Sequence, residues 1–482
     1  MLRDENRYDI KLFTCDREDE HTTMDGSNSV LTTFDETGVQ KFHWRTVITT
    51  GMGFFTDAYD LFIIGTVTAI LTPLWHLSTG QLAILNSTSL AAAAVGALVF
   101  GRLMDRLGRK TMYGIEVILL AIGALLSAFA PSFGWLVLFR VMVGLGVGGD
   151  YPTSSVIMSE YANRKNRGML VTMVFSMQGL GLLVGPLVAA GLLSTGMSHE
   201  IVWRLMLGLG AIPAASVIYL RRKMDETPRY LATVKKDSTA AAQVVSRLTG
   251  VSVNSANAAV AVKAQNFWNR KYLTRLLGTA GSWFLIDVAF YGNGVSSQLI
   301  LKALLPHAAL VTTVLVAAAI FAVAAVPGYY VAAAQMDKLG RKTIQVLGFL
   351  IMALAYAGIW LVPSVVKIPL LFLIIYAVSY FFIEFGPNTT TFLVPSEVFP
   401  TNLRGSGHGI SAAGGKTGAF LGAFVLPLIL KQIGLSSTMG LLAGVSILGV
   451  ALTLLTLPEM KQQSLEANEI SEVAPELQRR PS

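Results

Sequence analysis

Twelve apolar stretches, each long enough to cross a lipid bilayer as a helix, dominate this sequence. Spanning a bilayer takes about 20 largely apolar residues, and the spanning backbone must be helical because lipid offers it no hydrogen-bond partners. The stretches lie near residues 48–71, 82–104, 111–130, 134–158, 169–193, 202–220, 276–301, 308–334, 344–362, 369–394, 406–430 and 437–457. Only 14% of the 482 residues are charged, against about a quarter in soluble proteins. The sequence therefore predicts an all-α membrane protein with twelve transmembrane helices.

The longest polar break lies midway along the chain and divides the predicted helices into two groups of six. We expect a cytoplasmic N-terminal tail (1–45), a six-helix bundle (46–221), a cytoplasmic linker (222–275), a second six-helix bundle (276–458) and a C-terminal tail (459–482). Both tails are polar, and we expect them to be flexible. The first tail holds no apolar run typical of a cleavable signal peptide.

Basic residues gather in the loops after the second, fourth and eighth stretches, whereas the opposite loops hold little beyond Lys302, Lys367 and Lys431. Because basic loops stay on the cytoplasmic side of a membrane, both termini are predicted to be cytoplasmic. The formal net charge of +8 fits loops that face anionic lipid better than it fits nucleic-acid binding. Cys15 is the only cysteine, which excludes an intramolecular disulfide and a cysteine metal cluster.

The two halves repeat each other in sequence. Residues 104–111 (MDRLGRKT) return as residues 336–343 (MDKLGRKT), with one change that keeps a basic side chain. Two further matches at nearly the same offset pair Ser159-Glu160 and Arg167-Gly168 with Ser396-Glu397 and Arg404-Gly405, and Gly51, Phe54 and Asp57 with Gly281, Phe284 and Asp287. Two repeated halves with a substrate site between them, near the membrane midplane, is an arrangement that transporters use.

Several strings resemble motifs of known transporters. Asp105 to Lys110, and Arg140 with the glycines at 144, 146 and 148, resemble motifs of the major facilitator superfamily. A narrower resemblance, to the phosphate:proton symporter family of plants and fungi, covers nearly all twelve predicted helices. It is carried by GFFTDAYDLF (53–62), GDYP (149–152) with MSEYA (158–162), WFLIDVAFY (283–291), FIEFGPNTTT (382–391) and HGISAA (408–413), ending at Lys416. Met104 departs from the loop motif, which usually has a small residue there. The resemblance implies the fold of that superfamily, in two pseudo-symmetric six-helix bundles, and proton-driven import of inorganic phosphate by alternating access.

Ionisable residues inside membrane-spanning helices cost about 2.5–3.5 kcal/mol each on insertion scales, so each is a candidate functional residue. Asp57 and Asp60 share a helix face, where two carboxylates cannot both ionise cheaply, so one is expected to hold a proton. The alternative is a pair of interfacial caps or salt-bridge partners. The resemblance implies that this pair couples transport to protons and that Arg140 and Asp150 belong to the same path. For Arg140, a purely structural ion pair stays open.

Lys416 is the only lysine well inside an apolar stretch, about ten residues or roughly 15 Å from its start, too deep to snorkel to the interface. A phosphate anion needs a positive charge and several hydrogen-bond donors. The resemblance carries the following residues onto a phosphate pocket: Tyr151, Gln178, Trp283, Asp287, Tyr291, Asn388 and Lys416. For the aromatic members, ordinary packing is the alternative. Asp287 fits beside an anion if it accepts a hydrogen bond from a substrate O–H or takes a proton.

The repeated charged loops are expected to close a cytoplasmic gate by pairing across the two halves. The predicted gate residues are Asp105, Arg109, Glu160, Arg167, Asp337, Arg341, Glu397 and Arg404. The alternative is that basic loops only set membrane topology. Glu116 and Glu384 are further carboxyl groups that could join polar networks.

Two other functions stay open. A sugar or organic-anion porter of the same superfamily is the first, although Lys416, Tyr151 and Asp287 together argue against a neutral sugar. A phosphate-sensing receptor without net transport is the second, although the tails and linker offer no signalling domain. We expect no enzymatic activity, cofactor or metal, because GGKT (414–417) and GLGVGG (144–149) lack the spacing and strand–helix context of nucleotide-binding motifs. The expected partners are inorganic phosphate, protons and membrane lipid, without nucleic acid, for a monomer in the plasma membrane.

Overall fold

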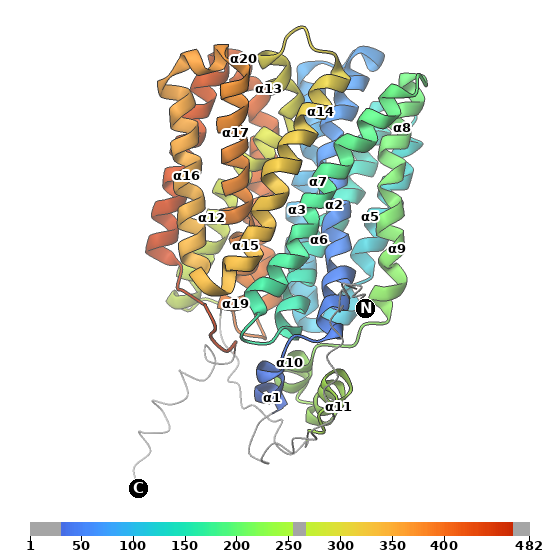
Figure 1. Cartoon of the computed structure of the whole chain (residues 1–482). Coiled ribbons are helices and arrows are strands. Elements are labelled where there is room, and N and C mark those ends of the chain that lie inside the picture. Colours follow the sequence, from blue (N-terminus) through green and yellow to red (C-terminus); the bar gives the residue numbers. More distant parts are fainter. Residues whose placement is uncertain (1–29, 254–266, 466–482) are drawn as a thin grey trace, which may run out of the picture.

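The computed structural model describes residues 30–253 and 267–465. Figure 1 shows them as a bundle of long, nearly parallel helices with shorter helices at one end, and these two ranges contain no strand. By length and composition, ten of the described helices can span a membrane. A further pair, α12 (Arg270–Val295) and α13 (Ser297–Leu304), meets the same criterion across a bend of 60°. The seventh stretch, predicted as one span over 276–301, is therefore a broken helix that turns at Ser296.

The final helix, α20 (Arg404–Thr456), accounts for two crossings. Its 53 residues would extend roughly 80 Å at 1.5 Å per residue, whereas the hydrocarbon core of a bilayer is about 30 Å thick. Gly434 interrupts it with a φ of 78°, a left-handed conformation that glycine adopts without steric cost. The described chain therefore crosses the membrane twelve times, as predicted.

Six crossings precede the linker and six follow it. In the first half they are α2 (Lys41–Trp75), α3 (Thr79–Leu107), α4 with α5 (Arg109–Met112 and Ile115–Ala128), α6 (Phe133–Tyr161), α7 (Arg167–Ser194) and α8 with α9 (His199–Leu209 and Ala211–Arg222). In the second half they are α12 with α13, α14–η3–α15 (Leu310–Ile320, Phe321–Ala325 and Val326–Leu339), α16 (Arg341–Leu361), α17–η5–α18–α19 (Pro369–Ile383, Glu384–Asn388, Thr389–Leu393 and Pro395–Val398) and the two parts of α20.

Local sequence explains why the halves match. Gly108 ends α3 and Gly340 ends α15, with φ of 102° and 96°, so the repeated loop makes the same left-handed turn in both halves. The halves lie side by side in Figure 1, with α3 and α6 against α20 and α7 against α14 and α15. A Cβ at Gly101 would lie 2.6 Å from the carbonyl oxygen of Gly405 and 2.8 Å from the Cα of Gly409. Small residues thus allow the backbones of the two halves to approach closely.

Short helices cover one end of the bundle, which we call the linker end. They are α1 (Val30–Glu36), α10 (Pro228–Tyr230), η1 (Leu231–Lys235) and α11 (Ser238–Thr249) (Figure 1). Val30, Leu31 and Phe34 are buried there, and so are Met460 and Leu465 after the last span. The prediction that both tails are flexible throughout is wrong for residues 30–40 and 460–465, because their apolar side chains pack against the bundle. Cys15 lies outside the described residues.

Candidate functional site

Lys416 lies between the two halves, in the first part of α20, with its side chain 1% exposed. Its Nζ donates a hydrogen bond to the Tyr291 Oη at 2.8 Å and lies 3.5 Å from the Asp287 Oδ2. The Oη atoms of Tyr291 and Tyr151 are 3.1 Å apart, so a hydroxyl of the first half joins hydroxyls and charges of the second. The Trp283 ring lies 5.8 Å from that of Tyr151. We call these five residues the central cluster.

Aromatic rings compensate the buried ammonium group of Lys416. Its Nζ lies 4.0 Å from the ring centroid of Tyr151 and 4.3 Å from that of Tyr291, distances at which a cation is attracted to a ring face. The sequence placed five predicted substrate-binding residues on three different helices, and the structure brings them into contact. A deeply buried cation with hydroxyls beside it is suited to bind an anion.

Gln178 and Asn388, the other two predicted substrate-binding residues, form a second group. Tyr329 on α15 donates to the Gln178 Oε1 at 3.1 Å, and the Asn388 Nδ2 donates to the Tyr329 Oη at 2.8 Å and to the Glu384 carboxylate. We call these four residues the amide network. Both Nδ2 hydrogens of Asn388 are thus engaged, whereas Gln178 is engaged through its oxygen and keeps its amide hydrogens for another acceptor.

Sequence reasoning missed Tyr329, which is an aromatic residue in an apolar stretch with no further signal. Glu384 and Asn388 lie four residues apart on the same side of the π-helical segment η5, in which Gly386 leaves helical geometry before Pro387. Such irregular turns inside helices are frequent at functional sites. The Phe175 ring lies 5.9 Å from the ring of Tyr329 and 6.3 Å from that of Tyr151, so the amide network adjoins the central cluster.

The four residues assigned by resemblance to the proton path lie in two separate ion pairs plus one lone carboxyl group. Arg140 donates to the Asp60 Oδ2 at 3.1 Å and to the Asp60 carbonyl oxygen at 3.0 Å. Asp150 pairs instead with Arg221, at 3.0 Å. Asp57 is buried, and neither of its carboxyl oxygens accepts a hydrogen bond from any described residue.

Arg221 is a second residue that sequence reasoning missed, because it sits at the boundary between the sixth span and the linker. Its other Nη lies 3.2 Å from the Glu116 Oε1, and its guanidinium group lies over the Tyr113 ring, 4.3 Å from the centroid. The signal available in the sequence was Glu116, a carboxyl inside the third span that needs a cation. A Cβ at Gly53 would overlap both Asp150 and Arg221, so glycine is required where α2 passes this pair.

Carboxyl groups outnumber cations in this interior. Among the described residues of the middle of the bundle, away from the linker end, six buried carboxyl side chains face three buried basic ones: Asp57, Asp60, Glu116, Asp150, Asp287 and Glu384 against Arg140, Arg221 and Lys416. An unpaired charge buried in low dielectric is costly, and neighbouring carboxylates resist ionising together. The excess of carboxyl groups over basic groups therefore favours a bound proton on some of the six carboxyl groups.

A charge network joins the halves at the linker end. Glu160 accepts a hydrogen bond from Arg109 of its own half at 3.0 Å and from Arg404 of the other half at 2.8 Å. Arg109 also donates to the carbonyl oxygen of Thr401 across the interface, at 2.8 Å. Asp105 accepts hydrogen bonds from two backbone amides at the start of α20, at 2.9 and 2.6 Å, where the helix dipole favours a negative charge.

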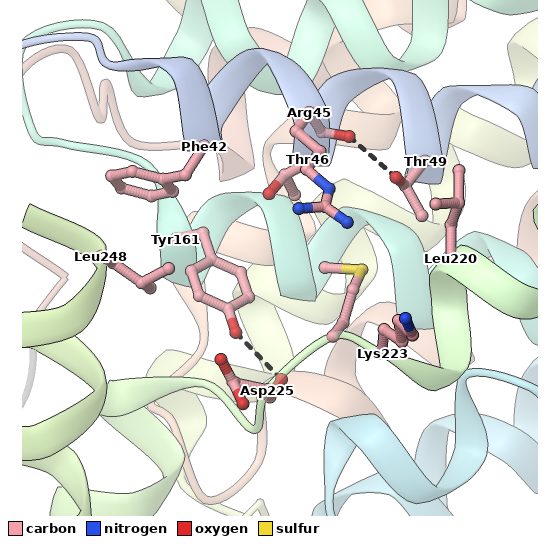
Figure 2. A pocket seen from close by; sticks show the side chains of 10 residues that line it. Phe42, Arg45, Thr46, Thr49, Tyr161, Leu220, Lys223, Asp225 and Leu248 are labelled. Carbon is pink, nitrogen blue, oxygen red and sulfur yellow. Dashed lines mark hydrogen bonds between the residues drawn. The ribbon is translucent and has the colours of Figure 1, made fainter.

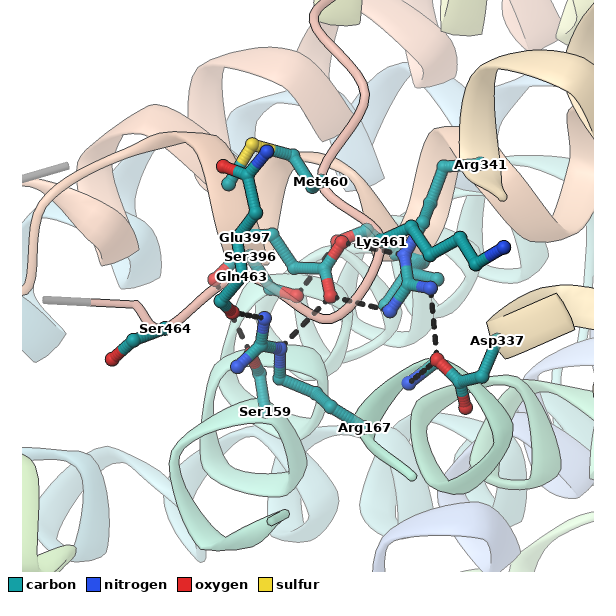
Figure 3. Close-up of polar contacts among 12 residues, drawn as sticks. Ser159, Arg167, Asp337, Arg341, Ser396, Glu397, Met460, Lys461, Gln463 and Ser464 are labelled. Atoms are coloured by element: carbon teal, nitrogen blue, oxygen red, sulfur yellow. Dashed lines mark hydrogen bonds and ion pairs between the residues drawn. The ribbon is translucent and has the colours of Figure 1, made fainter. Parts of the chain in front are cut away.

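The second half repeats this arrangement around Glu397 (Figure 3). Glu397 accepts a hydrogen bond from Arg341 of its own half and from Arg167 of the other half, both at 2.8 Å. Asp337 accepts from two backbone amides at the start of α7, at 3.1 and 2.7 Å. Arg167 also donates to the carbonyl oxygen of Gln463, which ties residues beyond the last span to the network. All eight predicted gate residues thus meet in two pseudo-symmetric clusters, while their gating role stays a prediction.

Two glutamates complete the network and were missed by sequence reasoning. Glu226 accepts from the backbone amides of Arg109 and Lys110, and Glu459 accepts from those of Arg341 and Lys342. Each glutamate lies 117 or 118 residues after the arginine it caps, so the internal repeat contained the signal. Burial raises the pKa of the Glu226 carboxyl above its ordinary value.

The far end of the bundle is also closed above the central cluster. The Phe62 ring of α2 lies 5.2 Å from the rings of both Phe290 and Tyr291 on α12. A Cβ at Gly65 would lie 2.6 Å from the carbonyl oxygen of Val295. The central cluster is therefore sealed from solvent at both ends, as in an occluded transporter.

Comparison with known proteins identifies the family. The family model described as "Sugar (and other) transporter" matches residues 42–472. The probable inorganic phosphate transporter 1-6 of Arabidopsis thaliana is 36% identical, over 91% of this chain and 95% of that protein. The low affinity inorganic phosphate transporter 1 of Petunia hybrida is 37% identical, over 91% of this chain and 94% of that protein.

Solved structures show the same fold. The proton:xylose symporter XylE bound to 6-bromo-6-deoxy-D-glucose superposes with a TM-score of 0.76 at 18% identity, over 90% of this chain and 99% of that one. A partially occluded inward-open form of the E. coli xylose transporter superposes with a TM-score of 0.72, over 88% of this chain and 100% of that one. The chain has the fold of the major facilitator superfamily transporter XylE, and it belongs to the sugar (and other) transporter family, as a relative of the plant inorganic phosphate transporters.

Proposed function

We propose that this chain imports inorganic phosphate across the plasma membrane together with protons, by alternating access, as a monomer with both termini in the cytoplasm. The buried Lys416, held by Tyr291 and Tyr151 at the junction of the halves, carries the proposal. The names of the curated relatives supply the substrate.

The central cluster suits a protonated phosphate. Lys416 attracts the anion, and the hydroxyls of Tyr151 and Tyr291 and the indole of Trp283 can donate hydrogen bonds to its oxygens. Asp287, 3.5 Å from Lys416, can accept a hydrogen bond from a phosphate O–H. Sulfate carries no O–H at neutral pH and would meet only repulsion there, so Asp287 is the proposed selectivity residue.

Phosphate binding requires the site to rearrange. Lys416 already donates to Tyr291, and Asn388 already donates to Glu384 and Tyr329. A bound phosphate would replace these internal partners, while the free amide hydrogens of Gln178 offer it a donor from the first half. Because the ligand then contacts both halves, its binding and release are coupled to their relative movement.

Protons balance the charge. The interior already holds more carboxyl groups than cations, so a phosphate monoanion adds to an existing excess of negative charge. Moving that charge inward against a membrane potential of 100 mV costs about 2.3 kcal/mol. One proton cancels this cost, and a second lets the potential drive uptake. Asp57, which has no hydrogen-bond partner in the part of the chain that the structure describes, and the Asp60–Arg140 pair are the proposed carriers.

Uptake of labelled phosphate into proteoliposomes with an imposed pH gradient tests the proposal. We expect the parent to accumulate phosphate when the outside is acidic, and Asp60→Asn and Lys416→Ala to fail. Lys431→Ala, which removes an exposed lysine of the same helix, is the matched control and should retain uptake. Binding without accumulation by the parent would indicate a receptor, and uptake that follows sodium and ignores pH would refute proton coupling.

A further inference from the structure

A pocket with no part in the transport site opens at the linker end of the first half. It lies where the start of α2 meets the end of α6, the end of α9 and helix α11 (Figure 2). Its volume is about 130 Å³, whereas one water molecule needs roughly 10–15 Å³. The pocket can therefore hold a polar group of several heavy atoms.

Two cations border this pocket. Arg45 projects from α2 into the space beside Tyr161 (Figure 2), and Lys223 borders it from the end of α9. Both side chains are exposed. Within the described residues the guanidinium of Arg45 has no ion pair, and the Nζ of Lys223 lies only over the Tyr219 ring, at 4.3 Å.

The one carboxylate of the pocket does not neutralise these cations. Asp225 lines the wall, but its Oδ2 pairs with Arg247 at 3.0 Å, and its backbone carbonyl accepts a hydrogen bond from the Tyr161 hydroxyl at 2.9 Å. The buried Thr46 adds a hydroxyl to the lining. A net positive pocket with hydroxyl donors is complementary to an oxyanion.

The rest of the lining is apolar and marks the boundary of the membrane. Phe42, Leu220, Met224 and Leu248 surround the charged groups, and the membrane-spanning part of α9 ends at Arg222. Basic pockets between helices at this level bind lipid head groups. We propose that Arg45 and Lys223 form a binding site for a phosphate group, either the head group of an anionic phospholipid such as phosphatidic acid or free inorganic phosphate.

This site is separate from the central cluster, and all the residues that line it precede the second half of the chain. It does not depend on the proposed transport function. A ligand there would brace α2, α6, α9 and α11 against one another, next to Glu160 of the linker-end network, because Tyr161 follows that residue on α6. Occupancy would therefore stabilise the first half as a rigid unit during transport.

Binding of short-chain phosphatidic acid to the purified full-length protein in detergent tests the proposal. Removing two basic residues that contact an anionic lipid head group should weaken binding roughly 30-fold, which corresponds to about 2 kcal/mol. We expect Arg45→Gln/Lys223→Gln to lose about that factor and Arg45→Lys/Lys223→Arg to retain binding. Arg164→Gln/Lys165→Gln removes two exposed charges of a neighbouring loop and should bind like the parent. Equal melting temperatures would show that the variants are folded.

A parallel titration with inorganic phosphate, in a Lys416→Ala background that removes the central site, distinguishes the two sources. Loss of phosphatidic acid binding alone in the double glutamine variant assigns the site to lipid. Loss of a phosphate-binding event in that background assigns it to free phosphate. If the double glutamine variant binds both probes as its parent does, or if the loop variant loses as much, the proposal is wrong.

Discussion

Substituting Glu397 with glutamine should shift the protein toward a form that is open at the linker end. Glu397 accepts a hydrogen bond from Arg167 of the other half, at 2.8 Å, and another from Arg341 of its own half. Of these two contacts, opening the halves breaks the one to Arg167. A hydrogen bond to a charged group contributes about 1.5–3 kcal/mol, so neutralising Glu397 should increase the open population roughly 10- to 150-fold.

The assay measures how fast a reporter cysteine is labelled when it is placed between the central cluster and the charge network at the linker end. Ser155 is fully buried one helical turn from Tyr151, and its Oγ donates to the carbonyl oxygen of Phe392 across the interface. In a Cys15→Ser background, Ser155→Cys should react with a membrane-impermeant maleimide only when the linker end is open. We expect the labelling rate to rise by at least tenfold in Glu397→Gln.

The control removes an ion pair of similar chemistry that does not join the halves. Glu200 and Arg204 pair at 2.7 Å with side chains 47% and 31% exposed, and exposed pairs contribute about 0–1 kcal/mol. Glu200→Gln should therefore label at the parent rate. Equal labelling of parent and Glu397→Gln, in protein with an unchanged melting temperature, would refute the view that this network holds the linker end closed.

Two further substitutions test the buried charges. Gly53→Ala would press a methyl group into the Asp150–Arg221 pair, and since breaking a buried ion pair costs about 3–5 kcal/mol, we expect a lower melting temperature and lost uptake. Gly191→Ala, where a Cβ meets open space, should change neither. Glu384→Gln keeps an acceptor for Asn388 but cannot exchange a proton, so the apparent KM for phosphate should vary less with pH than in the parent. If the apparent KM of Glu384→Gln varied with pH as it does in the parent, Glu384 would have no part in proton coupling.

Much of the architecture could be predicted because lipid restricts the backbone to helices of known length. The internal repeat also identified eight residues of the linker-end network, since Asp105 to Lys110 and its copy recur with the same spacing, but it was not used to find Glu226 and Glu459. The repeat could not reveal which charges meet. Glu160 and Glu397 each pair with one arginine of their own half and one of the other half, and the contact with the other half depends on how the two halves pack.

Other features depended on geometry that the sequence pattern does not encode. The break at Ser296 lies in the polar run GNGVSSQ (292–298), and η5 contains Gly386-Pro387, but these local signals do not give the direction of the bend or the contacts that it creates. Arg221 is the last residue of the predicted first bundle, next to the linker, and this position gave no sign that its side chain reaches back to Asp150. The tails looked polar on average, and only a few apolar side chains such as Phe34 and Leu465 dock them.

The number of protons that enter with each phosphate tests the central claim, that surplus carboxyl groups carry protons to balance a bound anion. It can be measured in proteoliposomes that contain a pH-sensitive dye, with labelled phosphate counted in parallel and the membrane potential clamped at zero. We predict at least one proton per phosphate for the parent and a lower ratio for Asp57→Asn. Phosphate accumulation without internal acidification would contradict the account.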